Sequence, residues 1–152
     1  MAARELIEFE NVLSLHKIKE LLNQFCRTNS TLIAPRSIGA WIEHRHSKIR
    51  LFGISATAYR ALTPNQQPSA RQSAVDRFNS RFEAIFQRRH DCIHNCDRPK
   101  VSTQPISDTS VRKVIEDVDF LVNRSLETLS VEFTEYLVGL GFSGATRNRV
   151  CM

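Results

Sequence analysis

Apolar residues recur at the three- and four-residue spacing of an α-helix along four long stretches of the chain. The pattern predicts helices over about residues 4–26, 36–59, 70–98 and 108–140. Four amphipathic helices with short connections favour an all-α fold, an antiparallel four- to five-helix bundle. We expect a single helical domain over residues 1–142, followed by a flexible C-terminal tail over 143–152.

The boundaries of these helices rest on local signals of different strength. Gly53 lies inside the second stretch and is expected to kink or break it, and residues 49–55 also alternate well enough for a short strand. Two prolines make residues 63–69 a linker, after which Ser69 is the expected N-cap of the third helix. Pro99 ends that helix, and Ser107 or Asp108 caps the fourth.

The fourth stretch has the most regular apolar stripe, which we expect to face the core. Its members are Val111, Val114, Ile115, Val118, Leu121, Val122, Leu129, Phe133, Tyr136, Leu137 and Leu140. Most of the nine phenylalanines and Trp41 fall on such stripes, so we expect them in the core rather than stacked on nucleic-acid bases.

Composition excludes several classes of protein. The 152 residues are 41% hydrophobic and 24% charged, as in an ordinary globular domain, and no uncharged apolar run is long enough to span a membrane. The first ten residues interleave acids with apolar side chains and lack the centre of a signal peptide, which favours a cytoplasmic location. Four irregularly spaced cysteines are then expected as reduced thiols.

The net charge of +5 is unevenly distributed along the chain. Residues 44–90 hold nine Lys or Arg against two acids, and residues 108–140 hold three against seven. A basic middle segment indicates a surface that faces a polyanion, and a set of solvated arginines is the alternative.

The densest cluster of reactive side chains occupies residues 87–98. Continuing the stripe of the third helix past Phe86 places Arg89 on the inward face, where an apolar residue is expected. A cation there needs an acidic partner, such as Glu116 or Asp119 on the fourth helix, unless it lines a pocket or an interface.

Arg89, the polar His90, three further residues and His94 match the R-polar-x3-H motif, so the chain resembles the HEPN superfamily. These are all-helical domains, many of them metal-independent ribonucleases, and the resemblance spans roughly residues 4–140. It implies a homodimer in which two copies of the motif face each other across a cleft. It also implies RNA as the substrate and no cofactor, with a nucleotidyltransferase-like antitoxin as a partner of many bacterial relatives.

The chemistry implied is attack of the ribose 2′-hydroxyl on the adjacent phosphorus, which leaves a 2′,3′-cyclic phosphate and a free 5′-hydroxyl. His94 would shuttle the proton, Arg89 would stabilise the phosphorane charge, and His90 would orient the phosphate. The residues expected to bind the substrate are Arg88, Asn95, Arg98 and, from a second basic cluster around His44 and His46, Arg45.

Two other interpretations remain open at this point. His90, Cys92, His94 and Cys96 suggest zinc, but on a helix neighbours two residues apart diverge by about 200° and the four cannot share one ion. The second is a non-catalytic HEPN-like module that binds RNA, a nucleotide or another protein. Growth arrest on induction would favour the ribonuclease, which could be the toxin of a toxin–antitoxin system.

Overall fold

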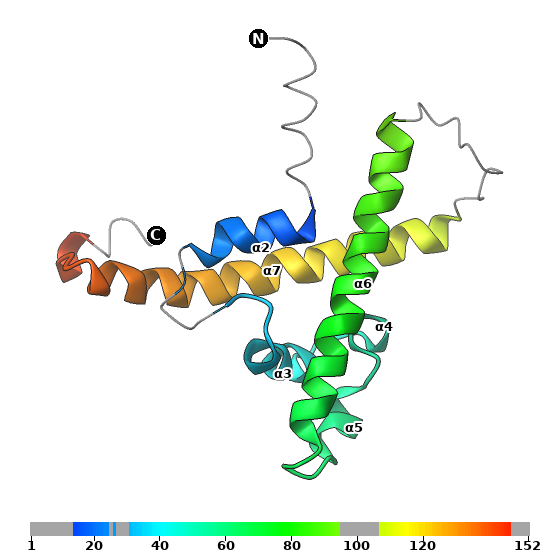
Figure 1. Cartoon of the computed structure of the whole chain (residues 1–152), viewed down its shortest axis with the longest axis horizontal. Helices are drawn as coiled ribbons and strands as arrows, with labels where there is room; N and C mark the ends of the chain where they lie inside the picture. Colours follow the sequence, from blue (N-terminus) through cyan, green and yellow to red (C-terminus); the bar gives the residue numbers. More distant parts are fainter. Residues whose placement is uncertain (1–13, 25, 27–30, 95–106, 147–152) are drawn as a thin grey trace.

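The computed structural model (Figure 1) describes residues 14–24, 26, 31–94 and 107–146, apart from the side chains of 91–94. All the secondary-structure elements within these ranges are helices: α2 (Leu15–Asn23), α3 (Pro35–Glu43), α4 (Ile49–Phe52), α5 (Ala56–Arg60), α6 (Gln67–His94) and α7 (Asp108–Gly139). The prediction of an all-α fold is confirmed for this part of the chain. No described helix is long and apolar enough to cross a membrane.

The stretch predicted as one helix over 36–59 consists of three short helices. His44 adopts an extended conformation with ψ 142° and ends α3, and Gly53, at φ +75°, ends α4 in the left-handed region. Ser55 then starts α5 by accepting a hydrogen bond from the Ala58 N–H at 3.1 Å. The predicted break at Gly53 is confirmed, whereas the alternative of a strand over 49–55 is wrong.

The two long helices begin close to their predicted starts. Helix α6 starts at Gln67, so Ser69 is inside the helix rather than its N-cap. The turn before it is closed by Gln66, whose side-chain oxygen accepts from both the N–H and the hydroxyl of Thr63, each at 3.0 Å. Ser107 is the N-cap of α7, as predicted, and accepts from the Ser110 N–H at 3.2 Å.

Helices α3, α4 and α5 gather along the first half of α6, on one side of α7 (Figure 1). Phe78 and Phe82 of α6 are completely buried among them. Trp41 meets Phe78 edge to face at 5.7 Å between ring centroids, and Phe52 stacks on the same ring at 5.6 Å. The prediction that these aromatic residues form the core is therefore confirmed.

Helix α7 crosses α6 steeply instead of running beside it, and the second half of α6 projects beyond the crossing (Figure 1). The antiparallel packing predicted for a bundle is not the arrangement of these two helices. Phe120 and Leu121 carry α7 into the core, with rings of Trp41 and Phe52 at 6.2 and 5.8 Å from that of Phe120. The core is thus concentrated where α3, α4 and α6 meet the middle of α7.

The apolar stripe predicted to face the core from α7 is only partly buried: Leu121 and Leu137 are buried, and several other members are exposed. Five apolar residues spaced along one side form what we call the α7 apolar face, each at least 38% exposed: Val111, Ile115, Val118, Val122 and Leu126. The buried side of α7 carries Asp117 and Phe120 together with Leu121 of the predicted stripe. The prediction is confirmed for Leu121 and Leu137 and wrong for the α7 apolar face, because the side of this helix that packs on the core is narrower than the predicted stripe and also holds the paired acid Asp117.

Candidate functional site

A buried carboxylate joins α4, α6 and α7 at the crossing of the long helices. Asp117 is completely buried, and its two oxygens accept from the Nε of Arg50 at 2.8 Å and the Nε of Arg81 at 2.9 Å. Arg50 also binds Glu116 at 2.7 Å. This hydrogen bond and the adjacent charge lower the pKa of Glu116 below its ordinary value. Two arginines and two acids therefore neutralise each other at the centre of the fold.

These pairs change the interpretation of the uneven charge distribution. Arg50 and Arg81 belong to the basic middle segment, and Asp117 and Glu116 belong to the acidic C-terminal third. Part of the opposite charge of the two segments therefore holds them together inside the protein. The signal was present in the sequence, since Asp117 stands three residues after Val114 and four before Leu121, where the period of the helix calls for an apolar residue.

The residues of the R-polar-x3-H motif lie on the part of α6 that projects past α7. Arg88, Arg89 and His90 are exposed, and within the described chain neither arginine takes part in an ion pair. The prediction that Arg89 points inward is wrong, because its side chain is exposed. His94 is the last residue of α6, and Asn95 and Arg98 lie outside the described residues.

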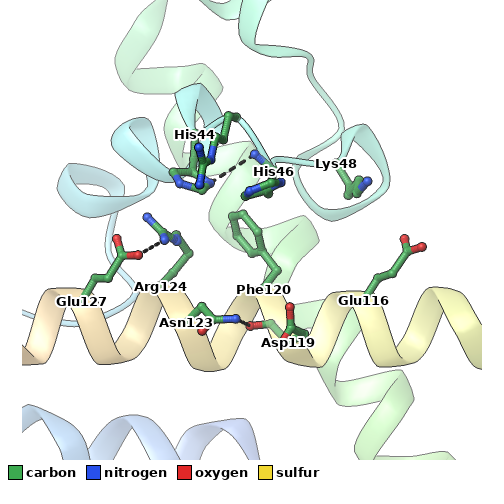
Figure 2. Close-up of a pocket in the computed structure, with 10 residues that line it drawn as sticks. His44, His46, Lys48, Glu116, Asp119, Phe120, Asn123, Arg124 and Glu127 are labelled. Carbon is green, nitrogen blue, oxygen red and sulfur yellow. Dashed lines mark hydrogen bonds and ion pairs between the residues drawn. The ribbon is translucent and has the colours of Figure 1, made fainter.

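Arg45 occupies a different location, in the turn between α3 and α4. Together with His44, His46 and Lys48 it forms one wall of a groove of about 470 Å³ (Figure 2). The other wall is the side of α7 that carries Glu116, Asp119, Phe120, Asn123, Arg124 and Glu127. Arg88, Arg89 and His90 do not line it, so the predicted site residues whose side chains the structure describes divide between the end of α6 and this groove.

Contacts within the groove orient the imidazole of His44. Its ring meets Phe120 edge on at 6.0 Å between centroids, and its Nδ1 accepts from the backbone N–H of His46 at 3.2 Å. Burial lowers the pKa of His44, and the nearby Arg124 guanidinium lowers it further. Because Nδ1 is an acceptor, the ring proton sits on Nε2, which makes His44 a hydrogen-bond donor to whatever occupies the groove.

The charges along the groove are only partly paired. Arg124 binds Glu127, and Figure 2 shows both side chains extending from α7 toward the histidines. Within the described part of the chain, Arg45, Lys48 and the Asp119 carboxylate have no such partner. The groove therefore offers two cations on one wall and an acceptor on the other. Sequence spacing does not reveal this arrangement, because the two walls come from distant parts of the chain.

No cluster of metal-ligating residues is present among the described residues, and His44 and His46 do not converge with a third ligand. Of the four residues near the end of α6 that suggested zinc, only His90 has a side chain that the structure describes. Cys26 is a free, buried thiol whose pKa is raised by burial.

Comparison of the chain with protein-family models, with curated proteins and with solved structures finds no match in any of the three. The candidate sites are therefore judged on their residues and geometry.

Proposed function

We propose that the protein is a metal-independent RNA endonuclease of the HEPN type, which leaves 2′,3′-cyclic phosphate and 5′-hydroxyl ends. The observation that carries this proposal is the state of Arg89. The buried Asp117 is already bound by Arg50 and Arg81, the exposed Glu116 is bound by Arg50, and Arg89 is exposed beside His90. A structural ion pair was the main alternative role for Arg89, so its exposure supports a role in binding an anion.

The chemistry proposed follows from the side chains of the motif. The planar guanidinium of Arg89 holds two non-bridging phosphate oxygens and stabilises the charge that develops on the phosphorane. His94 removes the proton of the 2′-hydroxyl and returns it to the leaving 5′-oxygen. Arg88 and His90 contact the neighbouring backbone. Because DNA lacks the 2′-hydroxyl nucleophile, the reaction is specific for RNA.

A second copy of the chain completes the proposed site. Positions 89 and 94 are five residues apart, so they point about 140° apart around a helix, and one copy does not direct both groups at one phosphate. The α7 apolar face, from Val111 to Leu126, supports self-association because an exposed apolar stripe of this length is typical of an interaction surface. A twofold contact would bring two motifs together automatically.

The test is RNA cleavage by the purified protein in the presence of EDTA. Arg89→Ala and His94→Ala are each expected to lower the rate at least about 100-fold, the usual contribution of an electrostatic donor or a proton-transfer group. Arg36→Ala, an exposed arginine on α3, is the matched control and should cleave at the native rate. Circular dichroism should show unchanged helix content in all three variants.

Cleavage that proceeds at the native rate in both motif variants would refute the assignment, as would a requirement for a divalent cation. Retained RNA binding with no cleavage by the native protein would favour the non-catalytic module instead. Growth arrest on induction, relieved by His94→Ala, would place the enzyme among toxins, for which a nucleotidyltransferase-like antitoxin is the partner we propose.

A further inference from the structure

The groove between the α3–α4 turn and α7 has the size and chemistry of a nucleotide site. Its volume of about 470 Å³ falls within the range of small-molecule pockets, roughly 300–1,000 Å³. One wall presents the exposed cations Arg45 and Lys48, and the other presents the exposed Asp119 carboxylate and the Asn123 amide. A ligand that fills it must combine an anionic group with hydrogen-bond donors on its opposite side.

We propose that this groove binds one nucleotide of a single-stranded RNA, with Arg45 and Lys48 on a phosphate and Asp119 on a guanine base. The inference rests on the proposed function only in taking RNA as the ligand. It adds a contact that selects the base, at a place that the motif on α6 does not occupy.

The choice of guanine follows from the acceptors on α7. A carboxylate offers two parallel acceptors, and guanine alone among the four bases presents two adjacent donors, N1–H and the N2 amine. Adenine and cytosine place a ring acceptor beside their amine, where it would repel the second oxygen of Asp119. Uracil has one N–H between two carbonyls. The Asn123 Nδ2 already donates to the Asp119 backbone carbonyl at 2.9 Å, which leaves its Oδ1 as a further acceptor.

The histidine wall suits the rest of the nucleotide. His46 is exposed and tilted by 50° against His44, so its ring offers a face on which a splayed base can stack. The Nδ1 of His44 accepts from the His46 N–H, so Nε2 is the nitrogen that donates to a ribose or phosphate oxygen. Phe120 and Arg124 are mostly buried beneath the rings and hold them in place rather than contacting the ligand.

Binding can be measured without cleavage by using 2′-O-methyl octanucleotides, which lack the attacking hydroxyl. Fluorescence anisotropy would compare an all-uridine octamer with octamers that carry one central guanine, adenine or cytosine. The guanine octamer is expected to bind at least about fivefold tighter than the other three, the lower end of the discrimination given by a bidentate contact to a base.

Three variants separate the contributions of the two walls. Asp119→Asn should abolish the preference for guanine and leave the affinity for the uridine octamer within about twofold, because the phosphate contacts remain. Arg45→Ala and Lys48→Ala should weaken all four octamers alike and make binding less sensitive to salt. Glu83→Gln, an exposed acid on α6 outside the groove, is the matched control and should change nothing.

Equal affinity of the native protein for the four octamers would overturn the inference, as would a preference for guanine that survives Asp119→Asn. Guanosine monophosphate is the probe for a free nucleotide. If guanosine monophosphate displaces the octamer at concentrations close to the octamer's dissociation constant, the ligand of the groove is a free nucleotide. That result would overturn the inference that the groove binds an RNA strand. The proposed function is tested separately by the cleavage assay, where it fails if cleavage does not depend on Arg89 and His94. That failure would not change the result of the octamer binding assay.

Discussion

Replacing Asp117 by alanine is the most direct test of how this fold is held together. The carboxylate is completely buried and accepts from both Arg50 and Arg81, so its loss leaves two guanidinium groups without their shared partner. Removing one member of a buried ion pair usually costs about 3–5 kcal/mol. The arginine side chains remain 29% and 30% exposed, so water partly replaces the lost carboxylate. We therefore expect the lower end of that range, about 3 kcal/mol.

The measurement is urea-induced unfolding followed by circular dichroism at neutral pH. A loss of about 3 kcal/mol in a domain of this size corresponds to a decrease in melting temperature of roughly 6–12 °C. Asp76→Ala is the matched control, because Asp76 is an exposed acid on α6, and it should change stability by no more than about 0.5 kcal/mol.

A double-mutant cycle tests whether the effect comes from the pairs themselves. Arg81→Ala should be much less destabilising in the Asp117→Ala background than in the native protein, because its partner is already gone. Asp117→Ala with a stability within about 0.5 kcal/mol of the native value would refute the reasoning. So would strict additivity of the two substitutions, because it would mean that the contribution of Arg81 does not depend on Asp117.

Two further predictions concern the surface of α7. Val122→Glu, in the α7 apolar face, should convert a dimer into a monomer in sedimentation equilibrium without lowering stability. The control Ser130→Glu, on the same helix, should remain a dimer. A native protein that sediments as a monomer would contradict the proposed dimer. Glu116→Gln should reduce the free energy of unfolding at neutral pH, and the difference from the native protein should vanish in acid. The direction of this pH dependence follows from the lowered pKa of Glu116, whose ionised form is stabilised by the contact with Arg50. That contact adds its full share to the free energy of unfolding above the ordinary carboxyl pKa, and the share is lost as the pH falls through the lowered pKa. A difference that stays constant down to strongly acidic pH would contradict this assignment.

The local features of the fold could be predicted from the sequence because short-range chemistry determines them. Ser107 caps α7, Gly53 ends a helix, and Trp41 and Phe78 lie in the core, as their spacing and residue types indicate. The helical class followed from the same periodicity. The motif around Arg89 was also visible in the sequence, although the role proposed for it depends on assays of cleavage.

The orientation and crossing of the helices needed the tertiary structure. The apolar period of α7 placed Leu121, Val118 and Val122 on one stripe, but in the fold the side with Leu121 is buried and the side with Val118 and Val122 is exposed. The buried side also holds Asp117, which is paired with two arginines. The groove likewise joins Lys48 and Asp119, residues from distant parts of the chain. The sequence alone thus determined the helical class, local breaks and caps such as Gly53 and Ser107, and the aromatic residues of the core. Only the tertiary structure decided which faces meet, because burying one charge requires partners that a helical period does not encode.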